Sequence, residues 1–352
     1  MKTSVHDYTL PELRQVVVAE LALPPYVASQ LYEWLYRHGS TAFDTMTNLA
    51  KPVRAALAER FSCALPEVAA EHASADGTTK YLFRLHDGKT IESVWIPAVR
   101  RDHTPRNTLC ISTQAGCAMG CTFCHTATMG LQRHLTQGEI LGQILAVQQR
   151  LPLATRLTNI VMMGMGEPLH NYESVVNAIR IMIDDRGLAF GKRRVTLSTV
   201  GLAPAIRRLG EERLGVKLAL SLHATTDELR NQLIPMGRKY ALAEILAACH
   251  DFCRAGAKGT RVTFEYLLLR DVNDSHADAE RLVRIVSQLP SKVNLIPWNP
   301  FPGARWDRPD DARIEAFAQW LRAKHVQVNT RISRGQDILA ACGQLATAKG
   351  GV

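Results

Sequence analysis

The stretch "LCISTQAGCAMGCTFCHTATMG", residues 109–130, joins a short apolar run to a loop rich in cysteine and glycine. Four of the chain's eight cysteines lie in it: Cys110, Cys117, Cys121 and Cys124. Three residues separate the second from the third of these, and two residues separate the third from the last. Soft thiolates at such intervals are typical of zinc or iron–sulfur sites. In a reducing compartment, clustered cysteines indicate metal binding or catalysis more often than structural disulfides.

The number of thiolates distinguishes two kinds of metal site. A structural zinc ion needs four ligands, usually supplied as two pairs, and this segment has no second pair. His125 adjoins Cys124, and adjacent residues of an extended chain point in opposite directions. Three cysteines instead leave one iron of a [4Fe-4S] cluster without a protein ligand, open to a small molecule. The pattern therefore favours the cluster, with zinc as the alternative.

Composition and charge set the broad class of the protein. The chain has 352 residues, enough for one large domain and a smaller one. It has no run of eighteen apolar residues, and "MKTSVHDYTLPEL" at its start lacks a signal-peptide apolar region. We therefore expect a cytoplasmic protein without a membrane segment. The 42 Lys and Arg residues outnumber the 33 Asp and Glu residues and include runs at 192–194 and 207–208. Such an excess suits nucleic acid, although solvated basic surfaces are the plainer explanation.

The first hundred residues predict a small appended module. "TLPE" at residues 9–12 is a capping box that opens a helix, and further helices are expected at 26–39 and 47–61. "TKYLFRLHDGKTIESVWIP" then reads as a β-hairpin around the turn at Asp87 and Gly88.

From about residue 105 onward, strand-like and helical segments alternate. This pattern predicts an α/β fold with a parallel sheet, either doubly wound or curled into a partial barrel. In both, function gathers at the carboxyl ends of the strands. The unusual loops fall there, among them 114–130, "GMGEP", "HATTDE" and "WNPFPG". The expected strands are 107–113, 158–164, 193–199, 216–222, 261–269 and 292–297, and the expected helices are 136–150, 172–184, 202–209, 240–256, 275–288 and 311–325.

The cysteine spacing, with Phe123 before the last cysteine, resembles the cluster motif of radical S-adenosylmethionine (SAM) enzymes. "MMGMGEPLHNYESVVNAI", "SLHATTDELRNQLIP", "NLIPWNPFPGA" and "RGQDILAACGQLA" together resemble the RlmN/Cfr family of adenosine methyltransferases. The N-terminal "YEWLYRHGSTAFDTMTNL" is similar to the accessory domain of the RlmN branch. The resemblance implies a partial (β/α)6 radical SAM barrel. It would comprise an accessory, RNA-binding helical domain with a hairpin at residues 1–98 and a core at 99–352.

The resemblance also implies a set of site residues. Cys117, Cys121 and Cys124 would hold a [4Fe-4S] cluster whose open iron chelates SAM. Outside the matched motifs, single Ser, His or Asn residues are usually ordinary loop hydrogen-bonding groups. The implied SAM contacts are Gly166, Glu167, Ser198, Ser221, Leu222, His223 and Asn299.

Three further residues would carry the reaction. Carbon 2 and carbon 8 of adenine are electrophilic, so direct polar methylation by SAM is unavailable. In the family, one SAM methylates a cysteine, which corresponds to Cys342. A radical from a second SAM then activates that methyl group for addition to the base. Cys110 would take the proton from the substituted carbon and form a transient disulfide with Cys342 as the methylated base departs. Glu92 corresponds to a proton acceptor of the RlmN branch; buried core thiols and a surface glutamate are the plainer readings of these three residues.

The leading prediction is an RNA (adenine-C2) methyltransferase acting on 23S rRNA, with tRNA as a further substrate. We also expect a monomer that takes electrons from a donor such as flavodoxin. The alternatives are a Cfr-type carbon 8 enzyme, an iron–sulfur RNA-binding protein without turnover, and a radical enzyme acting on a small metabolite. Three positions depart from the usual family pattern: Ala127, His134 and Gln336 stand where glycine, asparagine and an acidic residue are usual.

Overall fold

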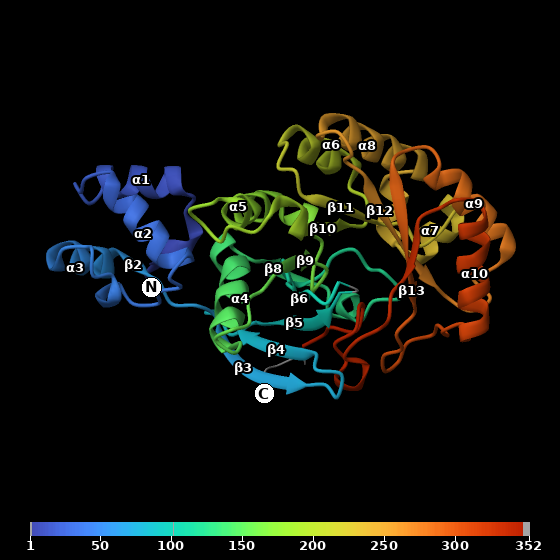
Figure 1. Cartoon of the computed structure of the whole chain (residues 1–352), viewed down its shortest axis with the longest axis horizontal. Coiled ribbons are helices and arrows are strands. Elements are labelled where there is room, and N and C mark those ends of the chain that lie inside the picture. Colours follow the sequence, from blue (N-terminus) through green and yellow to red (C-terminus); the bar gives the residue numbers. More distant parts are fainter. Residues whose placement is uncertain (1, 101, 348–352) are drawn as a thin grey trace.

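A computed structural model describes residues 2–100 and 102–347 of the chain. Its centre is a curved ten-stranded sheet, with most of the helices on its outer side (Figure 1). The strand order is β14-β13-β12-β11-β10-β9-β6-β5-β4-β3. The bounds of these strands are Glu67–Ala73 (β3), Thr79–Arg84 (β4), Thr90–Val99 (β5), Pro105–Cys110 (β6), Asn159–Met162 (β9), Val195–Thr199 (β10), Lys217–Ser221 (β11), Val262–Leu268 (β12), Ser291–Pro297 (β13) and Val328–Thr330 (β14).

In this sheet, β6 and β9 to β14 are all parallel and form the barrel wall. A helical crossover returns the chain to the start of each next strand, as parallel pairing requires. The predicted partial (β/α)6 barrel is thus confirmed, with the short edge strand β14 as an addition. The helices are Gln137–Arg150 (α4), Tyr172–Ile183 (α5), Ala203–Glu211 (α6), Asp227–Leu233 (α7), Leu242–Ala255 (α8), His276–Val286 (α9) and Asp311–Ala323 (α10).

The predicted hairpin is present and extends the barrel sheet. Its strands β4 and β5 pair antiparallel around the turn, where Gly88 has a φ of 79°. The long strand β5 pairs with β6 as well, with Trp95 opposite Leu109. Strand β3 completes the antiparallel part at the outer edge. The hairpin is therefore continuous with the first strand of the barrel.

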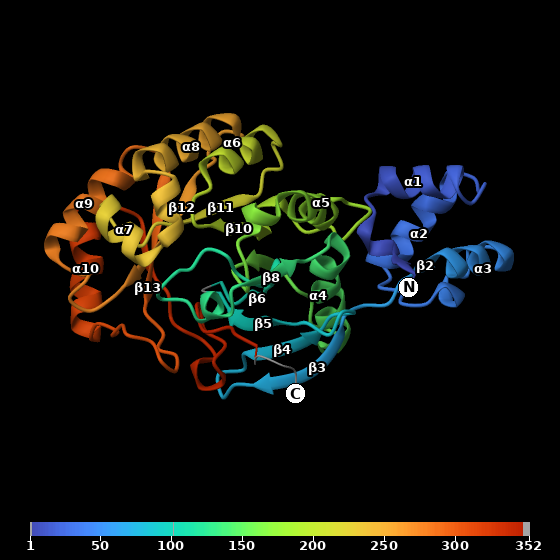
Figure 2. The same cartoon turned by 180° about the vertical axis from the view of Figure 1, so that it is seen from behind.

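The first sixty residues form a separate helical unit beside α4 and α5 (Figures 1 and 2). Its helices are Leu10–Ala19 (α1), Tyr26–Tyr36 (α2) and Lys51–Arg60 (α3). The predicted capping box opens α1, since the Thr9 amide donates to Glu12 Oε2 at 2.7 Å. The unit is fixed to α4 by polar contacts, including a 2.8 Å bond from the Gly138 amide to Asp7 Oδ1.

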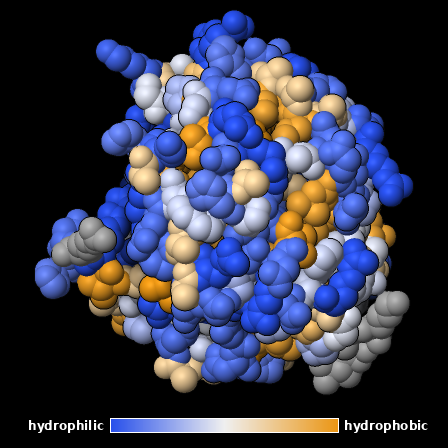
Figure 3. All heavy atoms as spheres, turned by 90° about the vertical axis from the view of Figure 1, so that its right-hand side faces the viewer, coloured by the Kyte–Doolittle hydropathy of each residue, from blue (hydrophilic) through white to orange (hydrophobic). Residues whose placement is uncertain are grey.

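Polar residues cover most of the outer surface. Figure 3 shows the face on the side of α9 and α10 as mainly hydrophilic, with apolar residues in small groups. No helix in the described part of the chain is long and apolar enough to span a membrane.

Candidate active site

The cysteine loop begins where β6 ends and is shaped by two glycines. Gly116 has a φ of +73°, and a Cβ atom at this position would lie 1.8 Å from the Gly130 carbonyl oxygen. The Cys117 amide donates to that same oxygen at 2.9 Å. Only glycine therefore permits the close approach that closes the loop and fixes Cys117.

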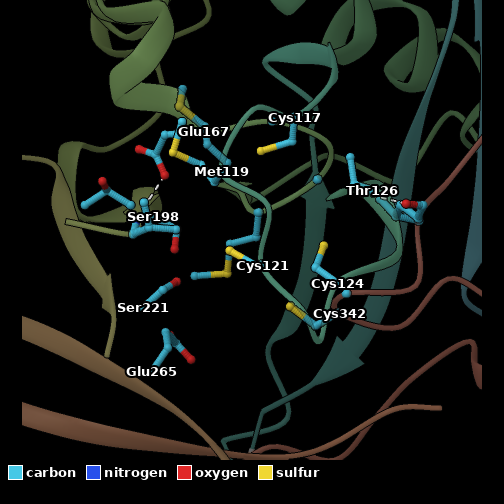
Figure 4. A pocket seen from close by; sticks show the side chains of 18 of the residues that line it. Cys117, Met119, Cys121, Cys124, Thr126, Glu167, Ser198, Ser221, Glu265 and Cys342 are labelled. Atoms are coloured by element: carbon cyan, nitrogen blue, oxygen red, sulfur yellow. Dashed lines mark hydrogen bonds between the residues drawn. The ribbon is translucent and has the colours of Figure 1, made fainter. Parts of the chain in front are cut away.

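The three cluster-motif cysteines line one pocket of about 830 Å³, measured with its mouth open to solvent. Figure 4 shows their sulfur atoms on one side of the pocket. Opposite them lie Glu167, Ser198, Ser221 and Glu265. Glu167 lies in the loop after β9, and the other three belong to β10, β11 and β12. Cys342, from the C-terminal segment, lies near Cys124. The structure thus gathers residues from distant parts of the sequence around one space.

The thiol set suits an iron–sulfur cluster. Burial raises the pKa of Cys117 to about 12 and raises the pKa values of Cys121 and Cys124 as well. Bound iron would displace these protons and hold the thiolates. Within residues 2–100 and 102–347, no three His, Cys, Asp or Glu side chains converge on one point as ligands of a single ion do. Three cysteines on one pocket suit a [4Fe-4S] cluster, whose fourth iron would stay open to SAM.

Glu167 links three loops around the pocket. Its carboxylate accepts from the Leu169 amide at 3.0 Å and from the Val200 amide at 2.9 Å. Its own amide donates to Gln114 Oε1 at 2.8 Å. Burial raises the pKa of Glu167 to about 7, although the bond from Val200 opposes the shift. The neighbouring Gly166 has a φ of +104°, and a Cβ there would meet the Gln114 side chain at 2.6 Å.

His223 ties the cysteine loop to the barrel wall. Its Nδ1 accepts from the Leu267 amide at 3.0 Å, and its ring meets Phe123 edge-on at 4.8 Å between centroids. Burial lowers the pKa of His223 to about 3, so the ring is neutral. Ser198 and Ser221 line the same pocket from β10 and β11.

Cys342 and Cys110 have thiols within electrostatic reach of each other. Burial raises the pKa of Cys110 to about 12, and the charge of Cys342 raises it further. Although Cys342 exposes part of its surface, desolvation raises the pKa of its thiol, and the Arg331 guanidinium lowers it in part. Both cysteines are free thiols in the structure. The chain therefore holds two reduced thiols together beside the pocket.

Comparison with known proteins agrees with this geometry. Residues 111–283 match the radical SAM superfamily, and residues 3–63 match the ribosomal RNA large subunit methyltransferase N-terminal domain. A dual-specificity RNA methyltransferase RlmN from Pelobacter propionicus is 49% identical over 98% of this chain and 96% of its own length. This chain belongs to the RlmN family. RlmN from Dinoroseobacter shibae is 45% identical over 99% of the chain and 90% of its own length.

A solved relative supports the fold along its whole length. The crystal structure of a radical SAM methyltransferase from Sphaerobacter thermophilus superposes with a TM-score of 0.90 at 47% identity. The match covers 97% of this chain and 98% of that one. As an RlmN-family member, the chain uses a [4Fe-4S] cluster and SAM.

Two of the predicted SAM contacts lie outside the pocket lining of this RlmN-family chain. Leu222 is fully buried in the core. Asn299 donates from Nδ2 to the Cys342 carbonyl oxygen at 3.1 Å and accepts from Gln336 Nε2 at 2.9 Å. Gln336, one of the three departures from the family pattern, thus holds Asn299 in place. The other five predicted contacts, Gly166, Glu167, Ser198, Ser221 and His223, line the pocket.

Glu92 lies on β5, beside the C-terminal segment and outside the pocket lining. It is only 4% exposed and forms an ion pair with Lys80 at 3.0 Å. Its Oε2 accepts from the Ala346 amide at 3.1 Å, four residues after Cys342. Burial raises the pKa of Glu92, although Lys80 opposes the shift.

Two pocket residues, Glu265 and Arg331, were missed in the sequence. Glu265 Oε1 accepts from Asn294 at 2.8 Å, whereas its buried Oε2 has no hydrogen bond and lies 3.6 Å from Arg331 Nη1. A buried carboxylate oxygen with free acceptor capacity beside the pocket suits a cationic ligand, and SAM carries an ammonium and a sulfonium group. The available signal was the single acid within the apolar strand "VTFEYLLL".

Proposed function

We propose that this chain methylates carbon 2 of an adenine in 23S rRNA, with tRNA as a further substrate. The observation that carries the proposal is Cys342, which lines the same pocket as the three cluster-motif cysteines and lies within electrostatic reach of Cys110. The relatives that match nearly the whole chain bear the name dual-specificity RNA methyltransferase. The match of residues 3–63 to the rRNA methyltransferase N-terminal domain favours carbon 2 over the Cfr-type carbon 8.

Each pocket residue has a proposed part in holding the cofactors. Cys117, Cys121 and Cys124 hold the cluster. The predicted SAM contacts would bind SAM, with Leu222 acting through its backbone and Asn299 through the loop that carries Cys342. When bound, the cluster supplies the electron that cleaves SAM, and SAM supplies the methyl group.

Cys342 in the pocket and Cys110 beside it carry the covalent steps. Cys342 loses its proton and accepts a methyl group on sulfur, which the nearby Arg331 cation favours by stabilising the thiolate. After the methyl carbon has joined the base, Cys110 takes the proton from the substituted ring carbon. The Cys110 sulfur then attacks the Cys342 sulfur, the bond from that sulfur to the methyl carbon breaks, and the proton held by Cys110 passes to the released carbon of the methylated base. Glu92 is a further proton acceptor. Burial raises its pKa, so its carboxylate is a stronger base than an exposed one.

Residues 1–98 are proposed as the accessory, RNA-binding domain and residues 99–352 as the radical SAM core. The separate helical unit supports the first assignment, and the continuity of β5 with β6 fixes the hairpin against the core. Arg101 and residues 348–352 of the core lie outside the described residues. We also propose that the enzyme works as a cytoplasmic monomer and takes electrons from flavodoxin. Such a compartment keeps the pocket thiols reduced.

Nucleoside analysis tests the proposal. Anaerobically reconstituted protein receives reductant, SAM and an unmodified large-subunit rRNA fragment, and the digested nucleosides are identified by mass spectrometry. We expect 2-methyladenosine; 8-methyladenosine would instead assign the carbon 8 activity. A protein with a verified cluster that forms neither methylated base nor 5′-deoxyadenosine would be the non-catalytic RNA-binding alternative. The Cys342→Ser variant, which keeps the cluster ligands, should lose methylation and keep RNA binding.

A further inference from the structure

Basic residues gather on the inner face of the barrel at the end opposite the pocket. Side chains alternate between the two faces of a strand, so residues two or four apart share a face. Ser221 and Glu265 face inward, since both line the pocket. Lys217 lies four residues before Ser221, and Arg261 lies four residues before Glu265. Both basic residues therefore belong to the inner face at the amino ends of β11 and β12.

Two more basic residues share this position. Lys292 lies two residues before Asn294, whose side chain bonds to Glu265 inside the barrel. Arg106 lies four residues before Cys110, and the charge of the pocket residue Cys342 raises the pKa of the Cys110 thiol. We call these four residues the amino-end basic cluster: Arg106, Lys217, Arg261 and Lys292.

The strand register brings the members of the cluster close together. Leu218 pairs with Val262, so Lys217 and Arg261 start side by side on neighbouring strands about 4.8 Å apart. Thr263 pairs with Lys292 on β13, so Lys292 lies level with the residue two positions after Arg261, closer to the pocket. Burial lowers the pKa of Lys217, and the charges of Lys292 and Arg106 lower it further. Because β9 and β10 separate β6 from β11 in the sheet, Arg106 acts on Lys217 across the barrel interior.

No carboxylate forms an ion pair with the cluster within residues 2–100 and 102–347, although Glu265 acts on Lys292 electrostatically at longer range. None of its four members has a carboxylate oxygen within 4.0 Å, whereas Arg331 higher in the barrel contacts Glu265. Arg261 makes a hydrogen bond to Gln327 Oε1 at 2.7 Å. Like charges opposite each other on neighbouring strands are destabilising, so an anion at this end would relieve a standing repulsion.

The basic run noted in the sequence lies at the same end. Lys192–Arg194 form a 3-10 turn directly before β10, at the amino end of that strand. Arg193 also lowers the pKa of Lys217. The run therefore extends the cluster toward the rim of the barrel.

We propose that the amino end of the barrel is a second anion site, separate from the SAM pocket, and that it binds phosphate groups. Lys and Arg offer many donors and no acceptor, and a phosphate group supplies several charged acceptor oxygens at once. A free phosphate compound and the RNA backbone share this chemistry. Strand β12 has seven residues and so rises roughly 23 Å. This rise separates the two ends of the barrel wall at β12.

Binding assays on protein loaded with the [4Fe-4S] cluster test the site without depending on methyl transfer. Inorganic diphosphate is titrated calorimetrically into the wild type and into the double variant Lys217→Gln, Arg261→Gln. The control double variant, Arg207→Gln, Arg284→Gln, removes the same charge from the outer helices α6 and α9. We expect one diphosphate per chain in the wild type. Its binding should be at least roughly ten-fold weaker in the Lys217→Gln, Arg261→Gln variant and unchanged in the control. The cluster variant should remain folded, with an equal or higher unfolding midpoint, because it loses like-charge repulsion.

A second arm separates the two sources of phosphate. Binding of a single-stranded RNA is measured across a range of salt concentrations. The slope of log affinity against log salt counts phosphate contacts. If this slope falls by about one to two contacts in the Lys217→Gln, Arg261→Gln variant, the site binds the RNA backbone. Loss of diphosphate binding with an unchanged RNA slope assigns it to a free phosphate compound. Equal behaviour of all three proteins, or the same effect from chloride at matched ionic strength, would mean an adventitious ion only and would overturn the proposal.

Discussion

At the scale of single residues, burial decides which protonation state the fold accepts. His6 is 1% exposed and packs edge-on against Tyr36, with 5.6 Å between ring centroids. Burial lowers the pKa of His6 to about 4, and neither ring nitrogen has a hydrogen-bond partner among the described residues. The folded protein therefore keeps this ring neutral over a range in which the unfolded chain binds a proton.

This difference predicts a loss of stability in acid. The folded pKa lies below the model-compound value of 6.5, so the contribution of His6 is complete above pH 6.5 and is lost as the pH falls toward 4. The loss amounts to about 3 kcal/mol of the free energy of unfolding. The variant His6→Phe, which keeps an aromatic ring beside Tyr36, should show a shallower decline in urea unfolding between pH 7 and 4.5. The exposed His250→Gln should follow the wild type, and parallel curves for wild type and His6→Phe would contradict the prediction.

A second residue-scale feature holds the Gly166–Glu167 loop. Gln114 Nε2 approaches His134 Nδ1 at 2.9 Å and His170 Nδ1 at 3.2 Å, while its Oε1 accepts from the Glu167 amide. The Gln114 amide nitrogen donates to the Nδ1 atoms of these two histidines, and the amide oxygen is then left to face the loop. His134, which stands where the family usually has asparagine, is thus one of two supports for Gln114.

The network predicts different effects for two substitutions. Gln114→Ala removes the partner of the Glu167 amide and should weaken SAM binding about ten-fold, as expected for a lost buried hydrogen bond. His134→Asn offers Oδ1 in place of Nδ1 and should change the affinity by no more than about two-fold. Calorimetric titration of SAM into cluster-loaded protein measures both. Equal losses in the two variants would show that Gln114 does not position the loop.

At the scale of elements, the cysteine loop depends on the contact between Gly116 and Gly130. The substitution Gly116→Ala places a Cβ 1.8 Å from the Gly130 carbonyl oxygen, so the β7–β8 hairpin (Gln114–Gly116 and Leu131–His134) has to move. We expect the variant to fold and to lose at least half of its bound iron, because Cys117 shifts with the loop.

A matched glycine provides the control. Gly88 also has a positive φ, +79°, yet a Cβ there would meet nothing within 4 Å. Gly88→Ala should therefore cost about 1 kcal/mol of backbone strain and leave the iron content unchanged. Iron analysis, with circular dichroism to check the fold, compares the two variants. Full iron content in Gly116→Ala would rule out the proposed role of this contact.

The elements also show how far the sequence alone could lead. Alternating apolar strands and amphipathic helices are local patterns, so the six barrel strands and the capping box at Thr9 were predictable. The cluster motif is equally local. The pairing of β5 with β6 was not predictable, because a hairpin with one buried face can pack in several ways until its edge partner is known. Glu265 and Arg331 were missed because they meet only when the barrel brings β12 and the segment after β14 together across β13.

At the scale of the whole molecule, function depends on two ends of one barrel and an attached helical unit. The pocket gathers at the carboxyl ends of the strands, as parallel α/β sheets require. The chain has a formal net charge of +9, and the amino-end basic cluster lies at the opposite end of the barrel. The pocket thus accounts for the chemistry, and the basic surfaces account for attraction to a polyanion.

This separation predicts that salt acts on RNA binding and SAM binding to different degrees. RNA affinity should fall at least roughly ten-fold between 50 and 200 mM salt, because each neutralised phosphate releases a bound counterion. SAM affinity should change by less than about two-fold, since the carboxylates of its site, Glu167 and Glu265, are buried and exposed charges are the ones that salt screens. Fluorescence anisotropy with a labelled rRNA fragment and calorimetry with SAM provide the two curves on the same cluster-loaded protein. RNA affinity that is independent of salt would show that phosphate contacts do not drive recognition, and the basic surfaces would then be ordinary solvated faces.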